Sequence, residues 1–292
     1  MHAYLIIAHN QFELLEKLIL ALDDERNDIF VHIDAKVKDF DFGHFQSITK
    51  FSHVIFTDER INVTWGDYSQ VKCEIALFRK AAEYDNKNTP YSYVHLISGV
   101  DLPIKSNDYI HSFFDEHNGK EFIHHSDNVV SQLSKNRLQY YHLFRRKRTK
   151  LNIFLSQVIL RAEKLLRVNR LKNADISVQK GCNWVSITGE FLHYIVDNLE
   201  KYNKYFKHSY CADETFVQTI AESSYFRDRL YMPDCKNNHD ACMRLIDWER
   251  GNPYVWRSED YDTIIESPCI FARKFDMNVD SEIIDRILSF LI

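Results

Sequence analysis

Adjacent charged side chains at two places in the 292-residue sequence could support a group-transfer reaction. Asp213 and Glu214 stand at the start of a predicted helix, where an acid could act as a general base beside a cleft. Negative charge at a helix start also has a purely structural explanation, because it is favoured by the helix dipole. Arg273 and Lys274 lie between two phenylalanines, and this pair is either a solvated loop or an anion clamp.

A third polar cluster follows the apolar run Tyr93–Ser98, which is typical of a buried strand. Gly99, Asp101 and Lys105 come directly after it, and Gly99 leaves the backbone room to turn or to approach a ligand. In open α/β sheets, ligands bind just beyond the carboxyl ends of such strands. The alternative is that Asp101 caps the turn and Lys105 is solvated.

Alternating strand and helix patterns surround these residues. We expect strands at Ala3–His9, Asp28–Asp34, Ser52–Thr57, Tyr93–Ser98, Glu121–Ile123 and Asn183–Thr188. We expect helices at Gln11–Asp23, Tyr68–Glu83, Asn107–Glu116, Gly189–Leu199 and Ser281–Leu291. The first β-α-β unit implies parallel strands joined by a right-handed crossover. The predicted fold class is therefore α/β, a Rossmann-like central, mostly parallel sheet flanked by helices in one domain over residues 1–292. A GxGxxG fingerprint and a P-loop are both absent from the sequence.

Composition narrows the class of protein further. The chain opens without a basic segment or a long apolar run, so we expect no signal peptide and a cytoplasmic location. Six cysteines occur without CxxC spacing, and fourteen histidines without HxxxH or HExxH. We therefore expect reduced thiols and no metal site.

A strongly basic segment lies in the middle of a chain whose net charge is −5. Lys135–Lys172 contains twelve Lys or Arg residues and a single acid, Glu163. Apolar residues recur at helical spacing in Leu151–Arg170, beside a basic face. Such a helix either packs its apolar stripe on the body of the protein or meets an anionic membrane. Tyr140 and neighbouring aromatics are the only support for nucleic-acid binding, and no known motif accompanies them.

Several short motifs, in order along the chain, resemble the core-2/I-branching glycosyltransferases, a family that includes β-1,6-N-acetylglucosaminyltransferases and peptide O-xylosyltransferases. The matching features are the opening strand with His9, VHIDAK at Val31–Lys36, WGDYS at Trp65–Ser69, LISGVDLPIK at Leu96–Lys105, the Trp184 strand, ADET at Ala212–Thr215 and FARKFD at Phe271–Asp276. Each motif alone is weak, and LISGVDLPIK with FARKFD carries most of the resemblance.

The resemblance implies a GT-A-type fold, inversion at the anomeric carbon, a nucleotide-sugar donor and no divalent metal. By resemblance, Glu214 is the catalytic base, while Arg257 and Lys274 stabilise the leaving diphosphate in place of a metal. Asp34 matches an acid that reads the uracil ring, and Trp184 matches a residue that stacks on a sugar. The other positions assigned to donor or acceptor binding are His9, Trp65, Asp101 and Asp213.

The leading hypothesis is a bacterial, inverting, metal-independent glycosyltransferase. It would move a GlcNAc- or xylose-like sugar from a UDP-sugar to a glycan or lipid-linked acceptor in surface polysaccharide or glycoconjugate synthesis. The segment Arg145–Arg170 would contact the inner face of an anionic membrane, and no nucleic acid is involved. The alternative is a non-catalytic nucleotide- or glycan-binding module on the same fold, favoured if Glu214 faces away from the cleft.

Overall fold

The computed structural model describes residues 1–85, 89–147 and 149–291. Its central sheet has the strand order β3-β2-β1-β4-β6, with β1 (His2–Ala8), β2 (Asn27–Ile33), β3 (His53–Phe56), β4 (Tyr93–Ser98) and β6 (Ser186–Thr188). The first four are parallel to one another, and β6 runs antiparallel at the edge. The predicted α/β class with a mostly parallel sheet is confirmed.

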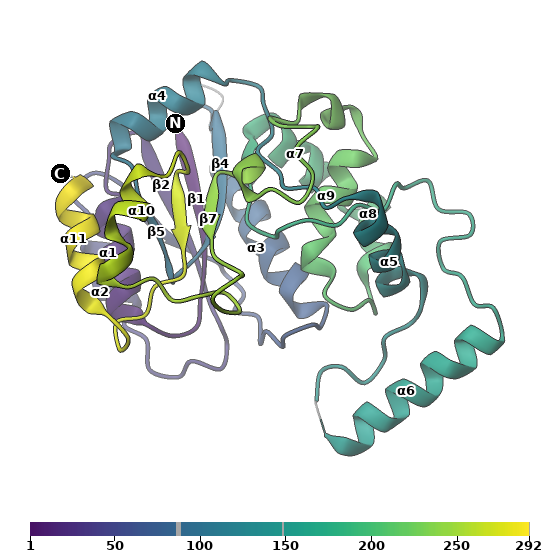
Figure 1. Cartoon of the computed structure of the whole chain (residues 1–292). Coiled ribbons are helices and arrows are strands. Elements are labelled where there is room, and N and C mark those ends of the chain that lie inside the picture. The colour runs from purple at the N-terminus through teal and green to yellow at the C-terminus, as the bar shows by residue number, and fades with distance from the viewer. Residues whose placement is uncertain (86–88, 148, 292) are drawn as a thin grey trace.

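A second, smaller sheet lies beside the carboxyl end of β4 (Figure 1). It has the order β5-β8-β7, from β5 (Asp101–Pro103), β8 (Phe271–Arg273) and β7 (Arg244–Ile246). Strands β5 and β8 are antiparallel, and their register places Asp101 directly opposite Arg273. The two motifs that carry most of the family resemblance are therefore neighbouring strands.

Eleven α-helices occur in the described part of the chain. They are α1 (Phe12–Ala21), α2 (Phe42–Ser47), α3 (Ser69–Tyr84), α4 (Asn107–Glu116), α5 (Asn128–Gln139), α6 (Lys150–Leu165), α7 (Gly189–Asp197), α8 (Leu199–Phe206), α9 (Phe216–Glu222), α10 (Tyr261–Glu266) and α11 (Ser281–Leu291). Helices α1, α10 and α11 lie on one side of the central sheet and α3, α7 and α9 on the other (Figure 1).

Residues of the central strands alternate between two apolar cores. In β1, Ala3 and Leu5 belong to the core that includes α3 and α7, whereas Tyr4 and Ile6 belong to the core that includes α1 and α11. This alternation follows from the two-residue period of a strand. Helices therefore cover both faces of the sheet, and its strand ends are left to form a site.

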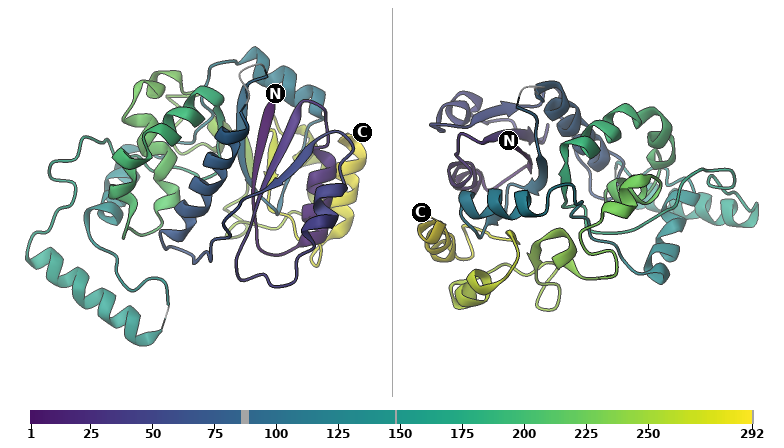
Figure 2. Two further views of the ribbon diagram at one scale, coloured as in Figure 1. Left: turned by 180° about the vertical axis from the view of Figure 1, so that it is seen from behind. Right: turned by 90° about the horizontal axis from the view of Figure 1, so that it is seen from above.

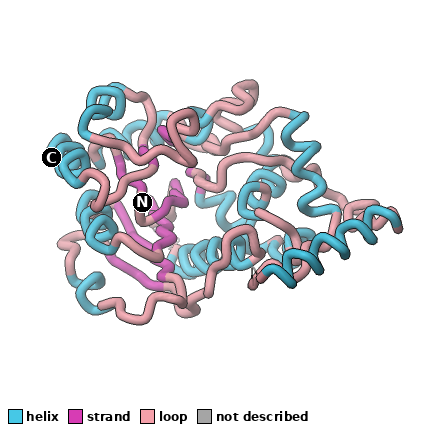
Figure 3. Tube along the Cα trace, turned by 60° about the horizontal axis from the view of Figure 1, so that its bottom comes forward, coloured by secondary structure: helices cyan, strands magenta, loops and turns pink. Residues whose placement is uncertain are grey.

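Helix α6 stands away from the body as an arm (Figures 1 and 2), and the tube in Figure 3 shows the same separation. Its buried residues are Ser156 and Glu163, whereas Leu151, Phe154 and Leu165 are 64%, 60% and 84% exposed. The apolar stripe therefore does not pack on the body, which was one of the two alternatives. In the described part of the chain, no helix is both long and apolar enough to cross a membrane.

The predicted elements differ from the observed ones mainly at their ends. Helices α4 and α11 have the predicted bounds, whereas the strand predicted at Asn183–Thr188 is observed only over Ser186–Thr188. Asn183 and Trp184 instead line a cleft, so their backbone leaves the sheet. The strand predicted at Glu121–Ile123 forms only isolated bridges at Glu121 and Phe122.

Candidate active site

A cleft opens at the point where the strand order of the central sheet reverses. The chain runs outward from β1 to β2 and β3, then returns to place β4 on the other side of β1. Ligands of open α/β sheets bind in the crevice at such a switch point. Here His9 and Asn10 after β1, with Ser98 at the end of β4 and Gly99 after it, line a cleft of about 890 Å³. That volume falls in the range of about 300–1,000 Å³ found for small-molecule sites.

Gly99 is required by the close approach of β1 and β4. Its amide donates to the Ile7 carbonyl at 2.9 Å. A Cβ at this position would lie 2.9 Å from the Cβ of Ala8, which is too close for two carbon atoms. The residue therefore lets the two strand ends meet at the floor of the cleft.

Asp101 fixes a cleft cation and does not itself line the cleft. Its fully buried carboxylate accepts hydrogen bonds from the Ser98 amide and hydroxyl, each at 2.8 Å, and from Arg273 Nη1 at 2.7 Å. The Arg273 guanidinium lies 4.7 Å from the centre of the Trp184 ring, and both side chains line the cleft. The structure thus places Asp101 against Arg273 and outside the cleft lining, whereas the resemblance implies a ligand contact for it.

Of the two cations predicted to grip a diphosphate, only one lies at the cleft. Lys274 lines it, next to Arg273. Arg257 is exposed and is not among the lining residues, and its amide donates to Asp260 Oδ2 at the start of a helical turn. The backbone at Arg257 is extended, so neighbouring side chains point to opposite sides. Trp256 takes the inward side and donates to the Arg273 carbonyl, so Arg257 faces solvent.

Glu214 faces the cleft and is held by two cations. It ends the 3-10 turn η1 (Ala212–Glu214), which leads directly into α9. Its Oε2 lies 2.6 Å from Arg137 Nη1 and 3.3 Å from Lys180 Nζ, and the side chain is 37% exposed. The orientation that would favour a non-catalytic module, with Glu214 turned away, is therefore not observed.

Beneath Glu214 lie two buried carboxyls that also border the cleft. Asp213 Oδ2 accepts a hydrogen bond from Gln70 Nε2 at 2.7 Å, and its Oδ1 is buried without a partner. Burial, followed by the nearby charge of Glu214, raises the pKa of Asp213 to about 7. Burial and then Asp213 raise the pKa of Glu74 well above its usual range. This part of the cleft can therefore hold protons at neutral pH.

Asp34 lies where β2 ends, as the sequence predicts. Its Oδ1 accepts from the Lys36 amide at 2.8 Å, and its Oδ2 lies 3.3 Å from both Lys36 Nζ and the Val63 amide. Asp34 is buried, whereas Lys36 reaches into the open cleft. With His9, these residues form the wall at the ends of β1 and β2.

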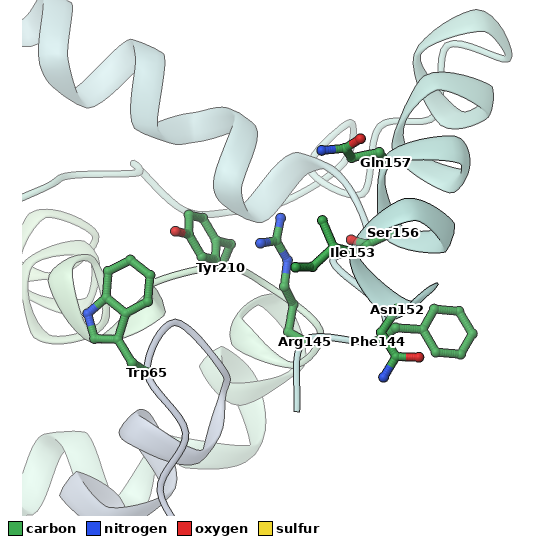
Figure 4. Close-up of a pocket in the computed structure, with 8 residues that line it drawn as sticks. All are labelled: Trp65, Phe144, Arg145, Asn152, Ile153, Ser156, Gln157 and Tyr210. Carbon is green, nitrogen blue, oxygen red and sulfur yellow. The ribbon is translucent and has the colours of Figure 1, made fainter. Parts of the chain in front are cut away.

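Trp65 stands at the mouth of the cleft and also lines a second, smaller pocket of about 120 Å³. Figure 4 shows this pocket between Trp65 and Tyr210 of the body and Ile153 of the arm, with Arg145 reaching in between them. The Arg145 guanidinium lies 4.3 Å from the centre of the Tyr210 ring. The base of the arm therefore adjoins the cleft entrance.

The fold also assembles a cluster that the sequence did not predict. Cys182, His239 and Cys242 each offer one donor atom, and the three atoms lie within 4.8 Å of one another. Cys182 and His239 line the cleft, while Cys242 is fully buried. Sequence spacing could not reveal this cluster, because Cys182 is far along the chain from the other two.

Several other cleft residues were missed for a simpler reason. Gln70 directly follows the matched motif at Trp65–Ser69, and Lys180 lies shortly before Trp184. Their proximity to recognised motifs was the available signal. Arg137 carried no such signal, since only the fold brings α5 to Glu214.

The fold and the cleft define an α/β protein with a polar ligand site at the switch point of its sheet. Comparison of the sequence with family models identifies the family: residues 2–272 match the model "Branch: Core-2/I-Branching enzyme". Because that match spans most of the chain, the chain belongs to the Core-2/I-branching enzyme family.

Curated relatives of the chain are xylosyltransferases at low identity. Xylosyltransferase 1 of Rattus norvegicus is 21% identical over 99% of this chain and 35% of its own length. Xylosyltransferase sqv-6 of Caenorhabditis elegans is 22% identical over 88% of this chain and 32% of its own length. The chain thus spans about a third of these relatives. Among solved structures, mouse xyloside xylosyltransferase 1 in its apo form is 10% identical, with a TM-score of 0.36, covering 93% of this chain and 97% of that one.

Proposed function

We propose that this chain is an inverting glycosyltransferase that moves a GlcNAc- or xylose-like sugar from a UDP-sugar to a hydroxyl group of a glycan or lipid-linked acceptor. Membership of the family and the xylosyltransferase relatives support glycosyl transfer. We further propose that residues 1–292 form one GT-A-type domain in which the basic segment around 135–172 is an insertion.

The observation that carries the proposal is that Glu214 lines the same cleft as Arg273 and Lys274. An inverting transfer needs a base for the acceptor hydroxyl and positive charge for the leaving diphosphate. Glu214 supplies the base. Arg273 and Lys274 stabilise the diphosphate as negative charge develops, and Asp101 holds Arg273 in place beforehand.

The remaining contacts follow from where each side chain lies. Asp34 and His9, at the ends of β2 and β1, receive the uracil and ribose. Trp184, beneath the Arg273 guanidinium, offers an aromatic face to the transferred sugar. Trp65 and the pocket beside it lie at the entrance, where an acceptor arrives.

The proposal is tested by donor hydrolysis, which needs no acceptor. Purified protein is incubated separately with UDP-GlcNAc, UDP-xylose, UDP-glucose and UDP-galactose, and released UDP is measured. We expect slow hydrolysis of one donor above the others. If no donor is hydrolysed and UDP still binds, the binding-module alternative is correct.

We propose that transfer needs no divalent metal, because the cleft already offers Arg273 and Lys274 to the diphosphate. EDTA is then expected to leave donor hydrolysis largely intact. Loss of hydrolysis on chelation, with recovery on adding Mn²⁺, would contradict this mechanism.

We propose that the enzyme acts in the cytoplasm at the inner face of the membrane, with α6 lying on anionic lipid. The exposed stripe of α6 and the exposed cations Arg146 and Lys147 form an amphipathic basic surface. Arg145 is turned inward onto Tyr210, so it does not belong to this surface. Arg148 lies outside the described residues. Because the arm adjoins the cleft entrance, a lipid-linked acceptor would arrive close to Glu214.

Sedimentation with vesicles tests the membrane contact. Protein should sediment with vesicles rich in phosphatidylglycerol at low salt and be released as salt rises, because exposed charges are screened within about 10 Å at 0.1 M salt. Replacing both Arg146 and Lys147 by Glu should abolish sedimentation without altering thermal unfolding. Wild-type protein that ignores such vesicles even at low salt would rule the contact out.

A further inference from the structure

Two cysteines and a histidine converge on the wall of the cleft. Cys182 lies in the loop before β6, and His239 and Cys242 are the two ends of the 3-10 turn η3 (His239–Cys242). A 3-10 helix has three residues per turn, so residues three apart project on the same side. This explains how both η3 side chains reach Cys182, with all three donor atoms within 4.8 Å.

We infer that Cys182, His239 and Cys242 form a binding site for a zinc-class divalent cation. Two thiolates with one imidazole are a donor set that soft and borderline metals such as Zn²⁺ prefer over oxygen ligands. Since Cys182 and His239 line the cleft, the fourth coordination position faces it and is available to water.

An orphaned ring nitrogen supports the site independently. His239 Nδ1 is buried without a hydrogen-bond partner, whereas its Nε2 accepts from Trp248 Nε1 at 3.1 Å. Nδ1 is therefore the atom available for a metal. Metal at Nδ1 leaves the ring proton on Nε2, which can then no longer accept from Trp248. Trp248 is half exposed and is free to turn outward, so its indole reports occupancy.

Neighbouring contacts already hold the two segments in position. The Cys182 amide donates to His124 Nδ1 at 3.0 Å, and the His124 ring stacks on that of His239 with centroids 4.5 Å apart. The His124 ring thus connects the loop of Cys182 to η3 before any metal binds.

Metal binding at this cluster would add a contact within the wall of the cleft. The loop that carries Cys182 also carries Lys180, which pairs with Glu214, and Trp184, which lies under Arg273. A metal at the cluster ties this loop to η3 in addition to the His124 contacts that already hold it, so removing the metal with EDTA leaves Lys180 and Trp184 in place. Arg273 and Lys274 remain the groups for diphosphate, so the site goes beyond the proposed function and does not depend on it.

Metal content is the first test. The reduced, full-length protein is purified without a metal-affinity step, and zinc is measured by mass spectrometry. We expect one zinc ion per chain in the wild type and none in Cys182→Ser or Cys242→Ser. Cys73→Ser is the matched control, because Cys73 is a buried cysteine of the same cleft that lies outside the cluster, and Ser can keep its hydrogen bond to the Gln70 carbonyl. This variant should retain its zinc.

Cobalt titration of the wild-type protein decides the matter even if the variants fail to fold. Co²⁺ should produce a thiolate-to-cobalt charge-transfer band together with a change in tryptophan fluorescence that Trp248→Phe removes. Zn²⁺, but not Mn²⁺, should displace the cobalt and raise Tm. Reduced wild-type protein that contains no zinc and takes up no cobalt would overturn the inference, as would recovery of Cys182 and Cys242 as a disulfide under these reducing conditions. These measurements use no sugar donor, so they are independent of whether transfer is observed.

Discussion

The cleft and the α6 arm both present cations, but they hold them in opposite ways. In the cleft, Arg273 is 19% exposed and is bound by a buried carboxylate at 2.7 Å. On the arm and the loop before it, Arg146, Lys147 and Arg161 are exposed and form no ion pair with any described carboxylate. The cleft cation has a single fixed position, whereas the arm cations can move with whatever surface they meet.

This difference in how the cations are held suggests that the cleft and the arm suit different kinds of anionic partner. A positioned, partly desolvated guanidinium suits one small phosphate group at a defined place, since charge-assisted hydrogen bonds are strong when geometry is fixed. Mobile exposed cations suit an extended, disordered surface such as lipid headgroups, to which each contributes about 1 kcal/mol. Binding at the cleft should therefore resist salt, and binding by the arm should not.

The largest effect is expected from substituting Glu214, the proposed base. Glu214→Gln keeps the shape of the side chain but cannot accept a proton, so turnover should fall about a hundredfold or more while UDP binding survives. Glu190→Gln is the matched control, because Glu190 also lies at a helix start and pairs with an arginine, Arg229, at 2.5 Å. Near-normal turnover in the Glu214 variant would remove it from the role.

The next test separates the two cations that the family resemblance treats alike. Lys274→Ala should weaken UDP binding about tenfold to a hundredfold, because a charge-assisted hydrogen bond contributes roughly 1.5–3 kcal/mol. Arg257→Ala should leave UDP binding unchanged, since that side chain faces solvent away from the cleft. Calorimetric titration with UDP measures both. Equal losses in the two variants would show that the bound cleft recruits Arg257 after all.

Membrane contact by the arm is tested by substituting Phe154, an exposed aromatic residue of α6. Phe154→Ser should reduce partition onto anionic vesicles about tenfold, because burying a phenylalanine side chain contributes about 1.5–3 kcal/mol. Phe51→Ser is the control: Phe51 is 54% exposed and Phe154 60%, but Phe51 lies on the body. A similar loss in both variants would mean that the arm is not the membrane-binding element.

The smallest expected effect is the pH dependence of stability that comes from the buried carboxyl of Asp213. The folded-state pKa of Asp213, about 7, lies above its ordinary value of 3.8, so the folded state binds this proton more tightly than the unfolded state. Stability from this group is therefore lost as pH rises from about 4 through 7, at about 1.4 kcal/mol per pKa unit. Asp213→Asn should raise Tm by a few degrees at pH 8 and change it little at pH 4.

Thermal unfolding of wild type, Asp213→Asn and Asp115→Asn at both pH values checks this prediction. Asp115 is an exposed acid on α4, so its substitution should shift Tm equally little at both. A pH-independent difference between Asp213→Asn and wild type would mean that Asp213 does not titrate in this range.

Local patterns were sufficient to predict the elements that end at the cleft. Apolar strands followed by polar residues identified the ends of β1, β2 and β4, because a buried strand and its turn are encoded within a few residues. Those ends place His9, Asp34, Ser98 and Gly99 along the cleft, whereas the binding roles of His9 and Asp34 stay predictions.

Local sequence patterns could not predict which residues far apart in the chain meet at the cleft, because those contacts depend on long-range pairing. That Arg273 rather than Arg257 reaches the cleft depends on the β5–β8 register, and the Arg137–Glu214 ion pair depends on where α5 packs. The exposure of α6 was also undecided, since the same amphipathic pattern serves for packing on a core or for contact with an outside surface. The cysteine–histidine cluster joins segments whose spacing matches no metal motif.

The pairing of β5 with β8 has a consequence for the order in which the protein matures. Asp101 meets Arg273, which follows it by 172 residues, and Gln11 Nε2 donates to Asp276 at 2.6 Å. During synthesis, β1 to β4 can form long before β8, which carries Arg273 to the cleft, has left the ribosome. A nascent chain can therefore have a sheet while its cleft still lacks Arg273 and Lys274, which arrive only when the last segment of the chain docks across the first.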